Sequence, residues 1–471
     1  MEIRESSQTQ GAKKEIQKIV EKQRRFYQTE KTRSLEFRLK ALTRLERYIK
    51  QYRLRLERAL YDDLKKSSSE AYMTEIGMVL SELHDMKKNL PLWDKKKRVS
   101  SPLSQFPAKS YCIREPRGCV LIIAPWNYPV LLSLQPLIGA IAGGNCAIIK
   151  PSEYASNTSA ILKEMLSVAF QEHYIAVVEG DAKESQQLLE HKFDYIFYTG
   201  GERVGKIVLE KAVPHLTPVT LELGGKSPCI VMESANLALS AKRIMFGKLL
   251  NAGQTCVAPD YVLVDEKVKD ALIEEMKVAI SEMYGKNPLT SKDYPAIINK
   301  KHYERLKGLI KEVDLLDQYR DCFLEDTLQI APILLDAPSL KAKVMTEEIF
   351  GPILPIVSYS TLNEAKEFVA AKEKPLALYV FTEKKEEGRS LMEGLSFGGG
   401  CLNDVVMHLA TSKLPFGGVG NSGMGSYHGK YSYETFTHKK GIMEKATWLD
   451  LKIRYAPYTD KKKKLVERFL G

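Results

Sequence analysis

The chain has 471 residues, of which 44% are hydrophobic and 27% are charged. This composition is typical of a globular protein large enough for two or three domains, and it excludes a wholly disordered or fibrous chain. The formal net charge is +11, but many of the lysines and arginines lie in the first hundred residues, among glutamates and apolar residues at helical spacing. We interpret them as solvated helix faces and expect no nucleic-acid partner, because neither aromatic stacking platforms nor a recognisable nucleic-acid-binding module is visible.

The cysteines and the N-terminus bear on the compartment. Seven cysteines are spread at long intervals without a CxxC pair, which matches neither a disulfide framework nor a zinc site. We therefore expect free thiols, no metal and a reducing compartment. The N-terminal MEIRESSQTQGAKKEI lacks the apolar core of a signal peptide, so we expect a cytoplasmic protein.

From about residue 12 to 90 the apolar residues recur at steps of three and four, which predicts helices. Residues 95–111, KKKRVSSPLSQFPAKSY, are expected to form an exposed segment or arm that leaves the body of the protein. From about residue 112 short apolar runs alternate with helical patterns; the runs are CVLIIAPW, CAIIKPS, YIAVVEG and FDYIFYTG. Continuous apolar runs are typical of strands buried between helices, so this alternation predicts a parallel, doubly wound α/β sheet.

Residues 118–149 carry no charge and would be long enough to cross a bilayer. PWNYP, Pro136 and GGN interrupt them, so we expect a strand, a turn, a buried helix and another turn, and no integral membrane span.

A second α/β region follows LELGGKSPCIVME. We expect helices in ALSAKRIMFGKLLNAG and KDALIEEMKVAISEM, and strands in YVLVDEK, QIAPILL and PILPIVSY. Two such units joined near residues 222–226 would leave a cleft between them, where ligands commonly bind. At the C-terminus, DKKKKLVERFLG is basic and faintly amphipathic. It could be attracted weakly to an anionic surface, but we favour a frayed polar tail.

Two segments at predicted strand ends are candidates for binding a nucleotide. TGGERVG, residues 199–205, follows the strand-like FDYIFY and precedes a helical pattern, where glycine backbone and the positive end of a helix can meet a phosphate. Its spacing departs from GxGxxG, so a plain strand-to-helix turn is an equal alternative. In IIKPSE, Lys150 and Glu153 could hydrogen-bond ribose hydroxyls, or Ser152 could simply cap a helix.

Cys256, in NAGQTCVAPD, is the candidate nucleophile because its neighbours are small and polar, a setting that a reactive thiol needs. The cysteines at 119, 146 and 229 lie in apolar runs and are expected to fill the core. Glu222, between two leucines, would be partly desolvated with a raised pKa, as suits a general base. A glutamate bonded to nearby backbone is the alternative. His428 is the one histidine in a glycine-rich setting, but nothing places it beside Cys256.

Together these fragments resemble the aldehyde dehydrogenase superfamily from about residue 15 to 445. The resemblance rests on seven motifs in order: PWNYP (125–129), KPSE (150–153), TGGERVG (199–205), LELGGKSP (221–228), NAGQTC (251–256), EIFGP (348–352) and PFGGVGNSG (415–423). The sequence around Cys256 and after residue 415 is most similar to the class 3 and fatty-aldehyde dehydrogenase branch.

The resemblance implies a reaction. Cys256 would attack the aldehyde carbonyl to give a thiohemiacetal, whose oxyanion the side-chain amide of Asn127 and the backbone N–H of Cys256 would hold. Loss of hydride to the nicotinamide would leave a thioester, and Glu222 would activate the water that releases the carboxylic acid. The expected activity is NAD(P)-dependent oxidation of medium- or long-chain aliphatic, or aromatic, aldehydes.

The resemblance also implies the cofactor site. We expect the cofactor to be NAD, with NADP possible, because Glu153 would repel a 2′-phosphate. Gly201 stands where relatives often carry Ser or Asn, which leaves the grip on the diphosphate in question. The residues expected to bind the cofactor are Trp126, Lys150, Ser152, Glu153, Gly200, Gly201, Val204, Gly205, Leu223, Glu348 and Phe350.

Three structural parts are implied as well. Residues 1–223 would form an NAD(P)-binding domain with an arm at about 95–115, residues 224–423 a catalytic domain, and residues 424–471 an oligomerisation segment. The resulting fold class is α/β, with two doubly wound parallel-sheet domains and a small oligomerisation arm, and a homodimer is expected. Two rival functions stay open: a thioester hydrolase or acyltransferase using Cys256, and a catalytically idle scaffold whose basic helices bind an anionic surface.

Overall fold

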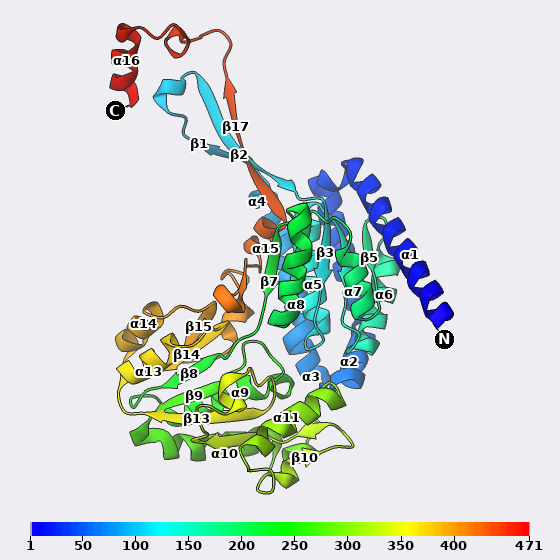
Figure 1. The fold of residues 1–471 in the computed structure, drawn as a ribbon, viewed down its shortest axis with the longest axis vertical. Coiled ribbons are helices and arrows are strands. Elements are labelled where there is room, and N and C mark those ends of the chain that lie inside the picture. The colour runs from blue at the N-terminus through cyan, green and yellow to red at the C-terminus, as the bar shows by residue number, and fades with distance from the viewer. Residues whose placement is uncertain (1, 471) are drawn as a thin grey trace.

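The computed structural model describes the backbone of residues 2–470 and the side chains of residues 13–468. Residues 1 and 471, the outer ends of the first and last predicted parts, lie outside the described residues. The chain forms two six-stranded sheets with helices packed around them, and a slender arm that projects from the body (Figure 1). This is the predicted α/β class, with parallel-sheet domains and a small arm.

The N-terminal quarter is helical, as the spacing of its apolar residues predicts. Helix α2 begins after Ser34, whose side chain accepts a hydrogen bond from the Phe37 N–H, and it buries Ala41, Leu42, Leu45 and further residues at the same spacing. A π-helical turn, η2, interrupts the next helix. The elements are α1 (Glu2–Gln28), α2 (Leu35–Leu64), α3 (Ser68–Ala71), η2 (Tyr72–Ile76) and α4 (Gly77–Trp93).

The first sheet has the strand order β16-β7-β6-β3-β4-β5, and all of its strands except the short β16 are parallel. Four of its strands, β3, β4, β5 and β6, are the predicted apolar runs, and β3, β4 and β6 are buried at every position. The bounds are β3 (Cys119–Ile123), α5 (Pro129–Gly143), β4 (Cys146–Lys150), α6 (Ser156–Ala169), β5 (Ile175–Val177), α7 (Ala182–Leu189), β6 (Tyr195–Thr199), α8 (Glu202–Ala212), β7 (Val219–Glu222) and β16 (Gly423–Met424).

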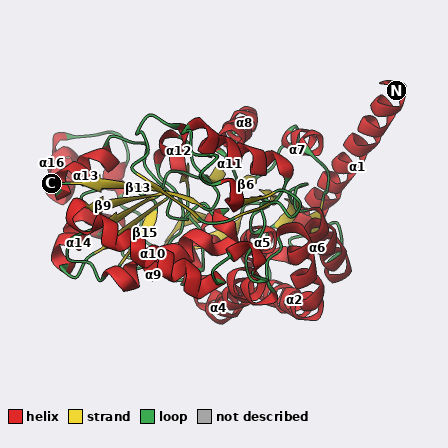
Figure 2. Ribbon diagram, turned by 90° about the horizontal axis from the view of Figure 1, so that it is seen from below, coloured by secondary structure: helices red, strands yellow, loops and turns green. Residues whose placement is uncertain are grey.

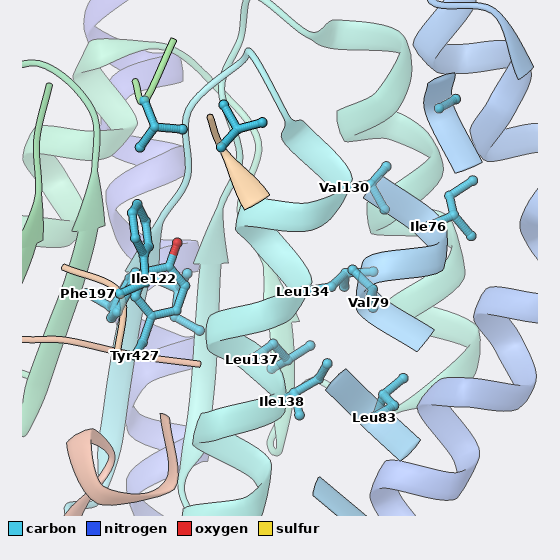
Figure 3. Close-up of a cluster of buried hydrophobic side chains, with 14 of the residues drawn as sticks. Ile76, Val79, Leu83, Ile122, Val130, Leu134, Leu137, Ile138, Phe197 and Tyr427 are labelled. Atoms are coloured by element: carbon cyan, nitrogen blue, oxygen red, sulfur yellow. The ribbon is translucent and has the colours of Figure 1, made fainter. Parts of the chain in front are cut away.

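The core of this part lies between α4, α5 and the sheet (Figure 3). Val79 and Leu83 from α4 meet Leu134 and Leu137 from α5, and all four are fully buried. The charge-free segment 118–149 is thus β3, a buried α5 and β4, as expected. In the part of the chain that the structure describes, no helix is both long and apolar enough to cross a membrane.

The second sheet is parallel throughout, in the order β12-β13-β9-β8-β14-β15, and helices lie on both sides of the strands (Figure 2). Its elements are β8 (Pro228–Val231), α9 (Leu237–Leu249), β9 (Tyr261–Asp265), α10 (Lys269–Tyr284), α11 (Lys300–Glu312), β12 (Ile333–Asp336), α12 (Lys343–Thr346), β13 (Ile353–Tyr359), α13 (Leu362–Ala370), β14 (Ala377–Phe381), α14 (Lys385–Glu393) and β15 (Gly399–Leu402).

Two boundaries differ from expectation in this region. QIAPILL is not one strand: it divides into β11 (Gln329–Ile330), paired with β10 (Phe323–Leu324), and β12. Pro332 separates the two, because proline has no N–H to donate to a sheet ladder. Likewise α9 ends at Leu249, and the following NAG forms a tight turn instead of a last helical turn.

The arm is a three-stranded antiparallel sheet of β1 (Lys97–Val99), β2 (Ala108–Pro116) and β17 (Thr437–Lys445), which brings the two predicted arm segments together (Figure 1). The predicted C-terminal segment is not all arm, since α15 (Lys430–Thr435) packs against α5 in the body. Beyond β17 the frayed tail that we favoured is wrong: residues 460–470 form helix α16. Lys462 bonds the carbonyls of Tyr455 and Pro457, and Leu465 faces an apolar cavity of 920 Å³ against the arm.

Candidate active site

A cavity of 330 Å³ lies where the carboxyl ends of β6 and β7 face the second sheet. It brings together the predicted catalytic residues and much of the predicted cofactor set. Of the predicted residues, those that line it are Trp126, Asn127, Gly200, Gly201, Glu222, Leu223, Cys256, Glu348 and Phe350. Lys150, Ser152, Glu153, Val204 and Gly205 are outside this lining, on neighbouring strand and helix ends.

The loop that carries Cys256 has an unusual backbone. Asn251, Ala252 and Gly253 adopt φ values of 53°, 52° and 77°, three left-handed residues in succession. A Cβ on Gly253 would lie 2.3 Å from the Gly351 carbonyl oxygen, so only glycine fits there. This turn ends α9 abruptly and leaves Cys256 half-buried on the cavity wall. Such strain persists only where the surroundings hold it, and it is concentrated at functional sites.

Glu222 is the last residue of β7 and is only 1% exposed. Burial raises its pKa to about 8, and the neighbouring Cys256 thiol offsets part of that rise. Its Oε1 atom has no hydrogen-bond partner among the described residues. A buried carboxylate with a free oxygen facing a cavity can accept a proton from a thiol or from a water. The alternative of a glutamate tied to nearby backbone does not describe this side chain.

The Cys256 thiol is protonated at rest. Burial and the nearby carboxylates of Glu222 and Glu348 raise its pKa well above the usual range. Its proton must therefore be accepted by a base when the sulfur attacks. His428 does not serve, because it packs against Phe416 and Tyr427 and burial lowers its pKa to about 3.

Asn127 lies 3% exposed just beyond β3, beside the cysteine loop. Its Nδ2 donates a hydrogen bond to the Gln254 carbonyl at 3.0 Å. A side-chain amide has a second hydrogen on the same nitrogen, which is available to a ligand in the cavity. The amide therefore has the donor that an oxyanion beside Cys256 would need.

On the nucleotide side, Lys150 ends β4 and is buried, which lowers its pKa. Its Nζ donates to the Pro151 carbonyl at 2.8 Å and lies 3.8 Å from Glu153, leaving donors for a ligand. Ser152 accepts a hydrogen bond from the Tyr154 N–H and so forms a turn, whereas the residue before α6 is Ala155 with no capping side chain. The alternative of Ser152 as a helix cap is wrong.

The glycine-rich turn leads directly into α8. Gly201 is the residue before the helix, and a Cβ built there would meet nothing within 4 Å. Gly205 differs, since its Cβ would lie 2.9 Å from a methyl of Leu223. Glycine at 205 thus serves close packing of helix on strand, while glycine at 201 leaves open space in front of a helix N-terminus.

Glu348 approaches the backbone at a second glycine pair. A Cβ on Gly224 would lie 2.1 Å from its carboxylate, so glycine is needed there for the two to approach. Burial, with the charge of Asp260, raises the Glu348 pKa to about 8. Phe350, in the left-handed region at φ 51°, packs edge-on to Trp126 with ring centroids 5.4 Å apart.

Sequence reasoning missed several cavity residues, and two of them, His302 and Arg305, lie on the first turns of α11. The His302 ring lies 5.0 Å from Trp126, and the low pKa of His302, about 4, is caused by burial. Arg305 Nη2 donates to the Ile349 carbonyl. Their three-residue spacing in KKHYERLKG does indicate one helix face, but nothing local shows that this face meets the glycine turn of the other sheet.

The residues present fit a dinucleotide. Thr199 Oγ1 is buried at the end of β6 and has no hydrogen-bond partner among residues 13–468, in line with the open glycine turn. Arg305 supplies a cation to the same cavity, and Glu348 supplies a carboxylate for hydroxyl groups. In the part of the chain that the structure describes, no group of three or more His, Cys, Asp or Glu is arranged to hold a metal ion.

One side of the cavity is the edge of a parallel sheet suited to bind a nucleotide, and the other side carries a thiol. Enzymes that oxidise a cysteine-bound substrate with NAD(P) have this arrangement. The chain belongs to the aldehyde dehydrogenase family, whose model matches residues 5–442. It is an NAD(P)-dependent aldehyde dehydrogenase, which oxidises aldehydes to carboxylic acids.

Individual relatives agree with this assignment. The chain is 50% identical to 4,4'-diaponeurosporen-aldehyde dehydrogenase of Staphylococcus aureus over 93% of its own length and 95% of that protein's. It is 42% identical to "Aldehyde dehydrogenase, dimeric NADP-preferring" of Canis lupus familiaris, covering 94% and 98%. Among solved structures, the substrate-bound state of Staphylococcus aureus AldH matches with a TM-score of 0.93 and 47% identity, covering 97% of this chain and 99% of that one.

Proposed function

We propose that the enzyme oxidises medium- or long-chain aliphatic, or aromatic, aldehydes through a thioester on Cys256. The single observation that carries the chemistry is that one cavity is lined by both the buried Glu222 carboxylate and the Cys256 thiol, and that each shifts the pKa of the other. As the sulfur attacks the carbonyl carbon, the thiol proton passes to Glu222 in its ionised form. The amide of Asn127 and the Cys256 N–H stabilise the resulting oxyanion, which develops at the former carbonyl oxygen.

The second half of the reaction uses the same carboxylate. Bound NAD(P) supplies the hydride acceptor, so that the carbon on sulfur reaches the oxidation level of a thioester. Glu222, once it has lost its proton, takes a proton from a water, and the water oxygen attacks the thioester carbon. The C–S bond breaks, the acid leaves and the thiol is restored.

For the cofactor we propose NAD as the preferred form, with NADP accepted. Lys150 and Glu153 would bind the adenosine ribose, the turn from Gly200 to Gly205 the diphosphate, and Glu348 the nicotinamide ribose. Ser152, Val204 and Leu223 would support this set, as would Trp126 and Phe350. Glu153 supports NAD because its carboxylate would repel a 2′-phosphate. A relative with "NADP-preferring" in its name supports use of the other form.

The substrate class is supported by the relatives. One relative, 50% identical to this chain, is named for 4,4'-diaponeurosporen-aldehyde, and the motif sequences resemble those of the fatty-aldehyde branch. We therefore propose apolar aldehydes as substrates, in preference to small polar ones.

We also propose that the enzyme is a cytoplasmic homodimer, with residues 1–223 as the NAD(P)-binding domain, 224–423 as the catalytic domain and 424–471, with the arm at 95–115, as the oligomerisation part. The arm supports this proposal because it has no core of its own and exposes large apolar side chains. Leu103 is 78% exposed and Trp448 is 72% exposed. A partner subunit packed on the arm would cover them.

The test is the absorbance of reduced nicotinamide, followed with NAD and NADP in parallel over aldehydes of increasing chain length and benzaldehyde. We expect a rise that grows with chain length and disappears in Cys256→Ser, while that variant still binds cofactor. Near-normal turnover in Cys256→Ser would overturn the assignment of the nucleophile. Activity on an acyl thioester without any nicotinamide would instead support the hydrolase.

A further inference from the structure

We propose that Lys66 and Glu75 form a buried ion pair that positions Asn127 for catalysis, an inference that rests on the oxyanion role given to Asn127 above. Lys66 lies just after α2 and Glu75 lies in the π-helical turn η2. Both side chains are fully buried, and Lys66 Nζ lies 2.7 Å from Glu75 Oε1. Neither residue lines the active-site cavity, so they act through Asn127 and are positioning residues.

The ammonium of Lys66 is directed at the backbone of Asn127. Its Nζ donates a hydrogen bond to the Asn127 carbonyl at 2.9 Å and lies 4.0 Å from the centroid of the Tyr128 ring. A buried ammonium is tolerated only where its donors are satisfied and its charge is paired. The position of the Asn127 peptide is therefore coupled to the buried ammonium of Lys66, which must keep its hydrogen bonds.

Glu75 holds the chain on the other side of Asn127. Its second oxygen, Oε2, accepts hydrogen bonds from the N–H groups of Val130 at 2.8 Å and Leu131 at 3.2 Å. Helix α5 begins at Pro129, and the residue before it, Tyr128, makes no side-chain capping bond. Glu75 thus supplies the acceptor and the negative charge that the start of this helix lacks. The π-helical turn that presents Glu75 is a rare form, found mostly at functional sites.

The same network reaches the cysteine loop. Asn251 Nδ2 donates to the Asn127 carbonyl at 2.8 Å, beside Lys66, while Asn127 Nδ2 donates to the Gln254 carbonyl at 3.0 Å. The hydroxyl groups of Tyr128 and Thr255 lie 2.6 Å apart. A shift of the Asn127 peptide would therefore change the direction of its free amide hydrogen relative to Cys256.

The test uses the double variant Lys66→Met/Glu75→Gln. It removes both charges of the pair together, and the glutamine oxygen can still accept from the Val130 N–H. The variant is made in the wild-type enzyme and in Asn127→Ala. The readouts are the pre-steady-state rate of nicotinamide reduction, the dissociation constant of the cofactor and the melting temperature. A matched control, Arg53→Met/Glu57→Gln, removes a more exposed ion pair of α2.

In the wild-type enzyme we expect the double variant to slow the pre-steady-state reduction about ten-fold or more, since a lost oxyanion donor costs about 10²–10³ in rate. The dissociation constant of the cofactor should not change. In Asn127→Ala, where no side-chain amide is left to position, the same double variant should change the rate by less than two-fold by our estimate from additivity. The α2 control should leave the rate unchanged in both backgrounds.

Two contrary results are distinguishable. Equal slowing in both backgrounds would mean that the pair acts through general stability, and it would overturn this inference while leaving the role of Asn127 intact. An unchanged rate in Asn127→Ala alone would remove the oxyanion role itself, and this inference would fall with that part of the proposed function.

Discussion

The carboxylate of Glu222 and the thiol of Cys256 lie at the wall of one cavity, and each changes the acidity of the other. Burial raises the pKa of Glu222 to about 8, and burial together with nearby carboxylates raises the pKa of Cys256 well above its usual range. Both groups are therefore predominantly protonated near neutral pH. Deprotonation is a step of the cycle, and one carboxylate is placed to assist it for both the thiol and the water.

We expect Glu222→Gln to slow thioester hydrolysis more than the hydride step. The amide cannot take a proton from water, and loss of a general base costs about 10²–10⁴ in rate. The measurement is a stopped-flow trace of nicotinamide reduction: a first turnover should be visible, followed by a much slower steady state. Equal slowing of both phases would contradict the water-activating role, and Glu210→Gln on the exposed face of α8 is the matched control.

Much of this site could be predicted because its residues are at positions that local sequence can mark. Strand ends and glycine turns place Glu222, Lys150 and Gly201, and the small polar neighbours of Cys256 distinguish it from the core cysteines. The resemblance added Asn127 and Glu348, for which local patterns say little. In the fold, the apolar runs predicted β3, β4, β5 and β6 of the first sheet and β9 and β13 of the second, but they did not include the fully buried β14.

The parts of the site and of the fold that the sequence did not predict depend on contacts between distant segments. Arg305 reaches the cavity only because α11 of the second region faces the glycine turn of the first, and no pattern in KKHYERLKG contains that information. Helix α16 was missed because its composition is strongly polar, and it is held by contacts with the preceding residues and the arm. The function of the pair Lys66 and Glu75 is likewise visible only when both are seen around Asn127.

The buried carboxylate predicts how stability depends on pH. The folded pKa of Glu222, about 8, lies above its ordinary value of 4.5, so the folded state favours the protonated form. Its contribution to stability is full below about pH 4.5 and is lost as pH rises through about 8. We therefore expect Glu222→Gln, which cannot ionise, to lose less melting temperature than the wild type between pH 6 and pH 9, by about 2–4 °C. Parallel melting curves of the two proteins, with Glu210→Gln as control, test this; identical slopes would contradict it.

The position of Arg305 in the cavity indicates that it contributes to cofactor binding, which the sequence motifs do not indicate. Its guanidinium lines the cavity, and its pKa is lowered by burial, as expected for a cation held away from water. We expect Arg305→Met to raise the KM for NAD or NADP about ten-fold or more, because a hydrogen bond to a charged group contributes about 1.5–3 kcal/mol. Steady-state kinetics at saturating aldehyde provide the measurement. Arg320→Met removes an exposed arginine of the same region and should have no effect.

At Gly201 a substitution should strengthen cofactor binding instead of weakening it. A Cβ there meets nothing within 4 Å, and the position precedes α8 at its positive end, so a serine would fit without displacing a neighbour. Its hydroxyl would add one donor toward the bound diphosphate, and we expect Gly201→Ser to lower the dissociation constant of NAD about three- to ten-fold, the effect of a net hydrogen bond of about 1 kcal/mol. Gly205→Ser is the matched comparison: its Cβ would lie 2.9 Å from Leu223, so that variant should lose stability and gain no affinity. Fluorescence titration with NAD distinguishes the two, and weaker binding in Gly201→Ser would show that the bare backbone at this turn is itself required.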